Sequence, residues 1–294
     1  MKPASFDYFS PSTLPEALTL MEEYGDEAKA LAGGQSLVPM MNMRLVRPRC
    51  IIDINRVGEL DYVRDNDGGL AIGALTRQRT VENSPLVRSR CPLLFEAVPN
   101  IANFQIRNRG TMGGSLVHAD PAADIPAVVS ALGAELIVAS SQGERVIPAE
   151  DFFVTYFTTS MEPSELLQEI RFPPWPARRG SAFLKVSRRH GDFALVGIAA
   201  HLTLDQIGAC TDAGIAFLGV GGTPVRTPQA ENKLVGSKVE DEIIEQAAGQ
   251  AMEEIEPESD VHASAEYRRH VTGVLLRRAL KIALERAKGE DQHG

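Results

Sequence analysis

Apolar residues recur every three or four positions between residues 14 and 21, and this spacing predicts an amphipathic helix. Thr13 stands three residues before Glu16, which is the spacing of a capping box, and Pro15 lies in the predicted first turn. Gly25 follows the last apolar position and is typical of a helix end. The chain therefore opens with a helix whose two ends are both marked in the sequence.

Shorter apolar runs alternate with helical patterns along the next part of the chain. Runs at 28–32 and 50–54 predict two strands around a Leu- and Met-rich helix near 37–45, which together make a β-α-β unit. Further strands are predicted at 61–64, 70–74, 135–139 and 166–172. Further helices are predicted at 80–88, 93–102 and 124–132.

A proline-rich run, Pro173-Pro174-Trp175-Pro176, interrupts this pattern. Prolines remove backbone donors and stiffen the chain, so we expect a domain boundary within 173–180. Beyond it the pattern predicts an antiparallel sheet of three strands, at 182–188, 194–204 and 214–220, and helices at 239–254 and 265–287. The expected domains are 1–176, with subdomains of about 1–57 and 58–176, and 177–288, followed by a tail at 289–294.

Composition narrows the class of protein. The chain has 294 residues, 44% hydrophobic and 23% charged, which is ordinary globular usage and a length that suits two domains. A net charge of −9 argues against a nucleic-acid binder, because that function needs concentrated positive charge. No apolar run is long enough for a transmembrane helix, and the start lacks the apolar stretch of a secretory signal. Three scattered cysteines without a CxxC pair fit a reducing compartment, so we expect a cytoplasmic location.

Two diglycine segments are the most informative feature of the sequence. One is Ala32-Gly33-Gly34-Gln35-Ser36-Leu37 and the other is Thr111-Met112-Gly113-Gly114-Ser115-Leu116. Glycine lets backbone approach an anion closely, and successive free amides at a helix start can bind a pyrophosphate. Hydroxyl side chains in both segments add donors. Two ordinary Gly-Gly turns would be the alternative interpretation.

Other nucleotide and metal motifs are missing. The sequence contains no GxGxxG fingerprint after a strand and no P-loop, and its six histidines show no short ligand spacing. His118, Asp120 and Asp124 follow the second diglycine. Asp120 with Pro121 fits a helix N-cap, whereas Asp124 could bond a ribose or ribityl hydroxyl.

At these residues the chain resembles the FAD-binding medium subunit of molybdenum hydroxylases, a family that includes carbon monoxide and xanthine dehydrogenases. The resemblance rests on AGGQSL near residue 32 and TMGGSLVHADPAAD near residue 111, and it extends to FDYFSPSTLPEAL at the start and KVSRRHGDFALVG at 185–197. It covers essentially the whole chain. It implies an α+β fold: a two-part FAD-binding domain of the vanillyl-alcohol-oxidase type, then a smaller domain with a three-stranded antiparallel sheet packed on helices.

The resemblance also implies a cofactor site. FAD would be bound without a covalent link, with both glycine segments on its pyrophosphate, Asp124 on its sugar-like chain, and Ile101, Leu167 and Lys185 flanking the flavin. The family often carries Asn where Ser115 stands here, which leaves that contact open. The positions that match cofactor contacts are Lys29, Ala30, Leu31, Ala32, Gly33, Gly34, Gln35, Ser36, Ile101, Thr111, Met112, Gly113, Gly114, Ser115, Asp124, Leu167 and Lys185.

The implied function is electron transfer within a larger complex. In this family a small subunit carries two [2Fe-2S] clusters and a large one carries molybdopterin, and three scattered cysteines here cannot supply the four thiolates of a cluster. We expect a dimer of heterotrimers in which this chain passes electrons to an external acceptor and contributes no catalytic acid–base pair. A self-sufficient FAD oxidase or reductase, with His118, His190 or Lys185 as its base, and a non-enzymatic nucleotide-binding scaffold stay open as alternatives.

Overall fold

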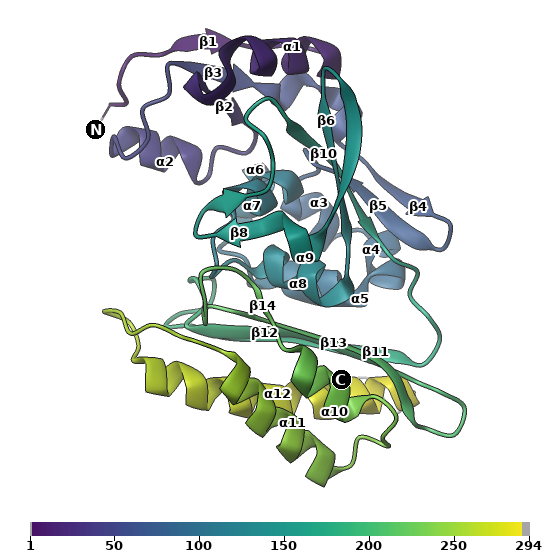
Figure 1. Ribbon diagram of the computed structural model, residues 1–294. Helices are drawn as coiled ribbons and strands as arrows, with labels where there is room; N and C mark the ends of the chain where they lie inside the picture. The colour runs from purple at the N-terminus through teal and green to yellow at the C-terminus, as the bar shows by residue number, and fades with distance from the viewer. Residues whose placement is uncertain (1, 290–294) are drawn as a thin grey trace.

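The first helix forms where its capping pattern places it. In the computed structural model, which describes residues 2–289, α1 (Leu14–Tyr24) follows Thr13, whose side-chain oxygen accepts a hydrogen bond from the Glu16 amide at 3.4 Å. Gly25 ends the helix with a φ of +46°. Beside α1 lies a parallel sheet in the order β1-β3-β2, and α2 connects β2 to β3 (Figure 1). The bounds are β1 (Asp7–Phe9), β2 (Ala28–Leu31), α2 (Leu37–Asn42) and β3 (Cys50–Asp53).

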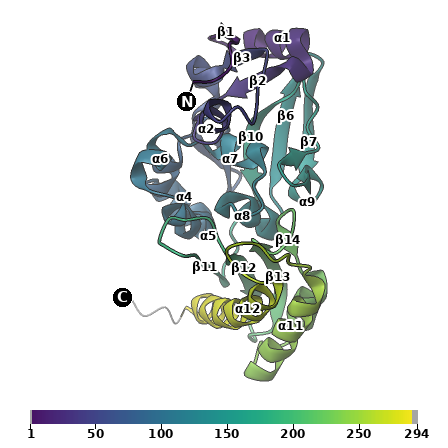
Figure 2. The same cartoon turned by 90° about the vertical axis from the view of Figure 1, so that its left-hand side faces the viewer.

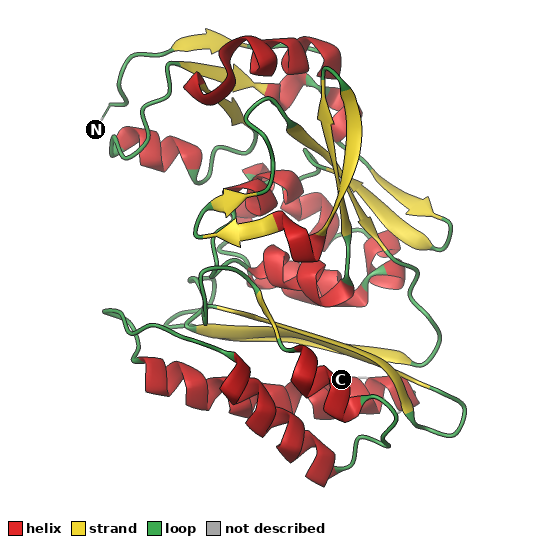
Figure 3. Cartoon of the chain, in the orientation of Figure 1, coloured by secondary structure: helices red, strands yellow, loops and turns green. Residues whose placement is uncertain are grey.

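The middle of the chain builds an antiparallel sheet with helices on one face. Its order is β4-β5-β10-β6-β7, and its inner face packs on α4, α5, α7 and α8 in one apolar core (Figure 3). The strands are β4 (Val63–Asn66), β5 (Gly69–Gly73), β6 (Glu135–Ser140), β7 (Gly143–Pro148) and β10 (Leu166–Phe172), with a small hairpin of β8 (Phe153–Thr155) and β9 (Thr158–Thr159). The helices are α3 (Gln78–Glu82), α4 (Pro85–Arg90), α5 (Pro92–Ala97), α6 (Phe104–Arg109), α7 (Met112–His118), α8 (Asp124–Leu132) and α9 (Ala149–Phe152).

A second antiparallel sheet follows, and both of its faces are covered. One face packs on α10, α11 and α12, and the other packs on α5 and α8 of the preceding unit (Figures 1 and 2). All nine residues of α8 are buried, as expected for a helix between two packed layers. The elements are β11 (Arg179–Val186), β12 (Val196–Leu204), β13 (Cys210–Leu218), β14 (Val225–Arg226), α10 (Pro228–Leu234), α11 (Asp241–Glu254) and α12 (Ala265–Lys288).

Several predicted elements need correction. The single helix predicted at 80–88 is wrong, because α3 ends at Glu82 and α4 starts at Pro85 after Ser84, whose hydroxyl accepts from the Val87 amide at 3.3 Å. The helix predicted at 93–102 stops as α5 at Ala97 and gives way to a 3₁₀ turn at 98–100. The short strand β14 adds a fourth member to the predicted three-stranded sheet.

The proposed boundary segment, 173–180, contains the link between β10 and β11 and the first two residues of β11. Residues from both sides of this link share one core, because Phe183 and Leu218 pack with α8. Residues 290–294 of the expected tail lie outside the described range. Within residues 2–289 no helix combines the length and apolarity needed to cross a membrane.

Gly180 marks a tight contact between β11 and α12, and it gives a test of this packing. A β carbon at Gly180 would overlap the Ala283 carbonyl oxygen and lie 2.5 Å from the Ala287 nitrogen, both backbone atoms of α12. We predict that Gly180→Ala lowers the free energy of unfolding by about 1–3 kcal/mol, measured by urea denaturation. Gly249→Ala is the control, because Gly249 lies in α11 with open space around its α carbon and should tolerate or gain from alanine. If Gly180→Ala unfolded at the same urea concentration as the parent chain, the sheet and α12 could separate at this point without cost, and the prediction would be wrong.

A buried histidine joins the two domains and should make stability depend on pH. His201 on β12 is 4% exposed, and its Nε2 lies 3.0 Å from the Ala131 carbonyl oxygen of α8. Burial lowers the pKa of His201 to about 4, and the positive charges of Arg179 and Arg226 act in the same direction. The carboxylate of Asp212 partly opposes this shift. Between about pH 6.5 and about pH 4 the unfolded chain therefore binds a proton that the native chain does not.

We predict that the native chain loses up to about 3 kcal/mol of stability through this group as the pH falls from 6.5 to 4. A His201→Gln variant keeps a side-chain amide that can donate to Ala131 but cannot titrate. The measurement is the urea midpoint of both proteins across this pH range. A constant difference between parent and variant at every pH would contradict the assignment.

Candidate functional site

The two diglycine segments, far apart in sequence, meet in space. A β carbon on Gly33 would overlap the Arg109 carbonyl oxygen and lie 2.9 Å from the Gly110 α carbon. A β carbon on Gly114 would lie 3.9 Å from that of Ala32. The first segment leaves the carboxyl end of β2 and enters α2, while the second enters α7. The contact is therefore one of backbone against backbone, and it needs glycine at position 33.

The first segment presents a run of free donors. No hydrogen bond within residues 2–289 uses the backbone N–H groups of Gly33, Gly34, Gln35 or Ser36. Gly34 has a φ of +71°, a left-handed conformation that turns successive amides to the same side. The Gln35 side chain folds back and donates to the Gly33 carbonyl oxygen at 3.0 Å. Consecutive free amides before a helix are an arrangement that fits a pyrophosphate.

The second segment works differently from the sequence-based expectation. Its Met112 and Gly113 amides donate to the backbone carbonyls of Thr76 and Ala74 at 3.0 and 2.8 Å, and the Gly114 amide donates to the Thr111 hydroxyl oxygen at 3.0 Å. These amides are engaged within the fold, so the prediction that both segments offer free amides is wrong for this one. Of its two hydroxyl residues, Thr111 is buried at 1% exposure and Ser115 is half-buried.

Three other predicted residues gather around a buried ion pair. Lys185 of β11 lies with its Nζ 2.9 Å from an Asp124 carboxylate oxygen, and the same nitrogen donates to the Asn100 carbonyl oxygen at 2.7 Å. Ile101 follows Asn100 in the chain and packs against the apolar core of the middle unit. Both charged side chains are less than a tenth exposed. Burial raises the pKa of Asp124, and the Lys185 ammonium opposes that rise.

The remaining predicted residues lie in the core, on β2 or before α8. Leu167 and Met112 are buried in the core of the middle unit, at 4% and 0% exposure, so their side chains serve packing. Lys29 is exposed on β2, followed by the half-buried Ala30 and Leu31. The expected N-cap role of Asp120 is wrong, because α8 begins at Asp124 and Asp120 instead accepts from the Ala122 amide at 2.9 Å.

Sequence reasoning missed two polar residues beside the first segment. Asn55 follows β3 and donates to the Ala32 carbonyl oxygen at 2.7 Å, and Arg77 donates to Asn55 Oδ1 at 2.7 Å. The available signal was that Asn55 comes just after a strand of a parallel sheet, at the edge where ligands of such sheets usually bind.

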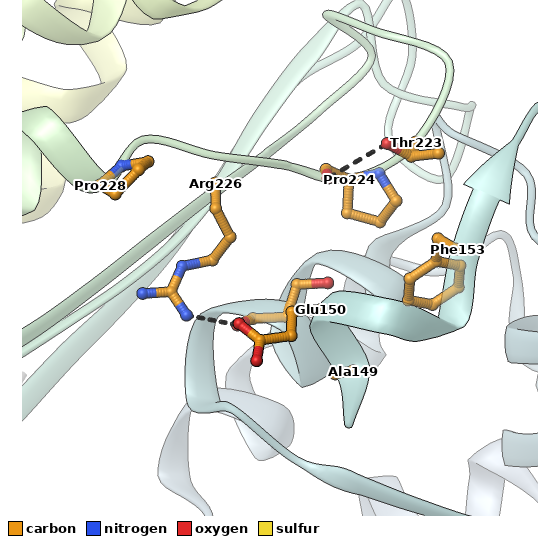
Figure 4. Close-up of a pocket in the computed structure, with 8 residues that line it drawn as sticks. Ala149, Glu150, Phe153, Thr223, Pro224, Arg226 and Pro228 are labelled. Carbon is orange, nitrogen blue, oxygen red and sulfur yellow. Dashed lines mark hydrogen bonds between the residues drawn. The ribbon is translucent and has the colours of Figure 1, made fainter. Parts of the chain in front are cut away.

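A separate cavity of about 290 Å³ lies between the middle unit and the C-terminal sheet (Figure 4). None of the predicted binding residues lines it. Its arginine, Arg226, is paired with Glu231 at 2.6 Å and donates to the Ser130 carbonyl oxygen at 3.1 Å. That charge is already balanced, so the glycine segments stay the candidate cofactor site.

Comparisons with known proteins identify the family of this chain. Residues 4–175 match the model of the FAD binding domain in molybdopterin dehydrogenase, and residues 181–283 match the CO dehydrogenase flavoprotein C-terminal domain. The 6-hydroxypseudooxynicotine dehydrogenase complex subunit alpha of Paenarthrobacter nicotinovorans is 46% identical over 98% of this chain and 97% of its own length. The carbon monoxide dehydrogenase medium chain of Afipia carboxidovorans is 36% identical over 98% of this chain and all of its own length.

Solved structures show the same likeness in three dimensions. A chain of carbon monoxide dehydrogenase from Hydrogenophaga pseudoflava superposes with a TM-score of 0.95 at 38% identity, covering 97% of this chain and 99% of that one. A chain of quinoline 2-oxidoreductase from Pseudomonas putida 86 gives 0.91 at 34% identity, covering 98% and 99%. Sequence, fold and the glycine site therefore agree that this chain belongs to the family of FAD-binding medium subunits of molybdenum hydroxylases.

Proposed function

We propose that this chain is the electron-transfer subunit of a multi-subunit molybdenum hydroxylase. It takes electrons from iron–sulfur clusters on a small partner subunit, itself supplied by a molybdopterin-bearing large subunit, and passes them to an external acceptor. The observation that carries the proposal is the run of free amides at 33–36 held against the second glycine segment. Relatives named as a medium chain or a complex subunit support the partnership.

The residues of the chain would bind and orient FAD without a covalent link. Amides of 33–36 would bind the pyrophosphate, with Thr111 and Ser115 as hydroxyl donors. Asp124 would accept from the sugar-like chain, and Ile101, Leu167 and Lys185 would lie at the flavin. When bound, FAD supplies the redox chemistry, because its ring takes up and releases electrons.

We propose that the chain works in a dimer of heterotrimers in the cytoplasm. No observation favours a self-sufficient oxidase. Lys185 is engaged by Asp124 and Asn100, and His118, whose pKa is lowered by burial, lies with its ring centroid 5.2 Å from that of Phe157.

We predict that Gly33→Ala weakens FAD binding by tenfold or more, about 1.4 kcal/mol, because the added methyl group must push the two segments apart. The measurement is a fluorescence titration of the FAD-free chain. Gly58→Ala is the control, since Gly58 has open space around it and lies outside both segments. Parent-like affinity in Gly33→Ala would exclude the cradle as assigned.

We also predict that the FAD-loaded chain by itself is not reduced by small organic substrates, since oxidation belongs to the molybdenum subunit. Stopped-flow absorbance would follow flavin bleaching with candidate N-heterocycles, first alone and then with an iron–sulfur partner and its molybdenum subunit. Rapid reduction is expected only in the complete mixture. Fast bleaching of the lone chain would instead establish a self-sufficient flavoenzyme.

A further inference from the structure

Two polar side chains connect the backbone of the first glycine segment to that of Arg109, which ends α6 two residues before the second segment, and both contacts use carbonyl oxygens. Asn55 Nδ2 donates to the Ala32 carbonyl at 2.7 Å, and Asn55 Oδ1 accepts from Arg77 Nη2 at 2.7 Å. The other end of the guanidinium, Nη1, donates to the Arg109 carbonyl at 2.8 Å. This is the carbonyl that Gly33 packs against. The bridge therefore holds the first segment against Arg109, where the two backbones approach closely, and leaves the amides of 33–36 free.

Arg77 differs from its neighbours in having no acidic partner. It is half-buried, and no salt bridge within residues 2–289 includes it. Its two hydrogen-bond partners are a neutral amide and a carbonyl. By contrast, the nearby Arg79 and Arg107 both pair with Glu82, at 2.9 Å. Burial and the adjacent Arg109 lower the pKa of Arg77, and the carboxylates of Asp61 and Asp53 oppose that shift without forming a salt bridge. A guanidinium stays protonated in proteins.

An unpaired charge that is partly removed from water costs free energy, and an anionic ligand nearby recovers some of it. The planar guanidinium also reaches two acceptors at once, which a lysine ammonium on a flexible stem does not reproduce. The charge of Arg77 and its reach to two acceptors both bear on ligand binding, because the free amides that the bridge supports suit a doubly charged pyrophosphate.

We infer that Arg77 is a positioning residue for the pyrophosphate of the cofactor. Through Asn55 it sets the spacing between the first glycine segment and Arg109, and its charge, which forms no salt bridge within residues 2–289, strengthens binding of the negatively charged ligand. The inference rests on the proposed function, since it takes FAD as the occupant, and it concerns a residue that neither contributes an amide nor belongs to a glycine segment.

The test compares FAD affinity among four single variants of the full chain and one double variant, with FAD removed beforehand and then titrated by fluorescence. Arg77→Gln removes the charge and, being shorter, also breaks the bridge, whereas Arg77→Lys keeps the charge and breaks the bridge. Asn55→Ala breaks the bridge with the charge in place. Arg79→Gln is the matched control, because Arg79 lies nearby on α3 and its guanidinium pairs with Glu82, away from the bridge. Each titration is repeated at about 50 mM and about 1 M salt, which screen charge very differently.

We expect Arg77→Gln to weaken FAD binding by tenfold or more at low salt, with a smaller loss in Arg77→Lys. The difference in FAD affinity between Arg77→Gln and Arg77→Lys should become smaller at high salt, because salt screens the charge that distinguishes them. A residue with a purely structural role would not show this response. Arg77→Gln combined with Asn55→Ala should lose little more than Arg77→Gln alone, because both changes break the same bridge. Arg79→Gln should bind FAD as the parent does.

Two results would overturn the inference. One is parent-like affinity in Arg77→Gln. The other is an equal loss in the Gln and Lys variants at both salt concentrations, because the charge would then have no part in binding. Urea unfolding of each FAD-free variant shows whether the fold itself has been damaged. Failure of the unaltered chain to bind FAD is a different outcome, which would overturn the proposed function and this inference together.

Discussion

The approach of one backbone to another at Gly33 is the constraint on which the site depends. Arg109 presents its carbonyl oxygen where a side chain at position 33 would have to stand, so only a hydrogen atom fits between the segments. That contact fixes where the free amides of the first segment lie relative to α7. The second segment keeps its own amides bonded inside the fold, so it acts as the support against which the first is placed. A binding surface made of backbone needs such a support, because loops by themselves have no fixed position.

A second constraint is the buried ion pair between Asp124 and Lys185. Removing two charges from water costs several kcal/mol for each ion, and the pair is tolerated only when geometry and further hydrogen bonds compensate. Here the Asn100 carbonyl supplies one of these bonds. The aspartate begins α8 of the middle unit and the lysine lies on β11 of the C-terminal sheet, so the pair joins the two domains. The shared core around α8 also joins the two domains, through apolar contacts. Lys185, proposed at the flavin, and Asp124, proposed at the sugar-like chain, thus lie at the junction of the domains, where the position of each depends on the other.

Most of the fold could be predicted from the sequence wherever a local pattern was strong. The helix at 124–132 and the strand at 166–172 form with the predicted bounds. The helix predicted at 80–88 failed for a local reason that was visible. Ser84 followed by Pro85 is a typical N-cap and first helical position, and it starts a new helix there. The 3₁₀ turn at 98–100 and the short hairpin of β8 and β9 had no comparable signal, because single turns depend on what they pack against.

The sequence by itself determined which residues could form a pyrophosphate site: two diglycine segments with hydroxyl neighbours, in an order that matches a known family. Those properties are local, since a glycine permits close approach whatever surrounds it. Only the tertiary structure decided that the amides of 33–36 stay free while those of the second segment are bonded, and that Asn55 and Arg77 connect the two. The same holds for the pairing of Asp124 with Lys185. A hydrogen-bond partner or a counter-ion comes from segments distant in the chain, so its identity follows from packing and cannot be read from neighbouring residues.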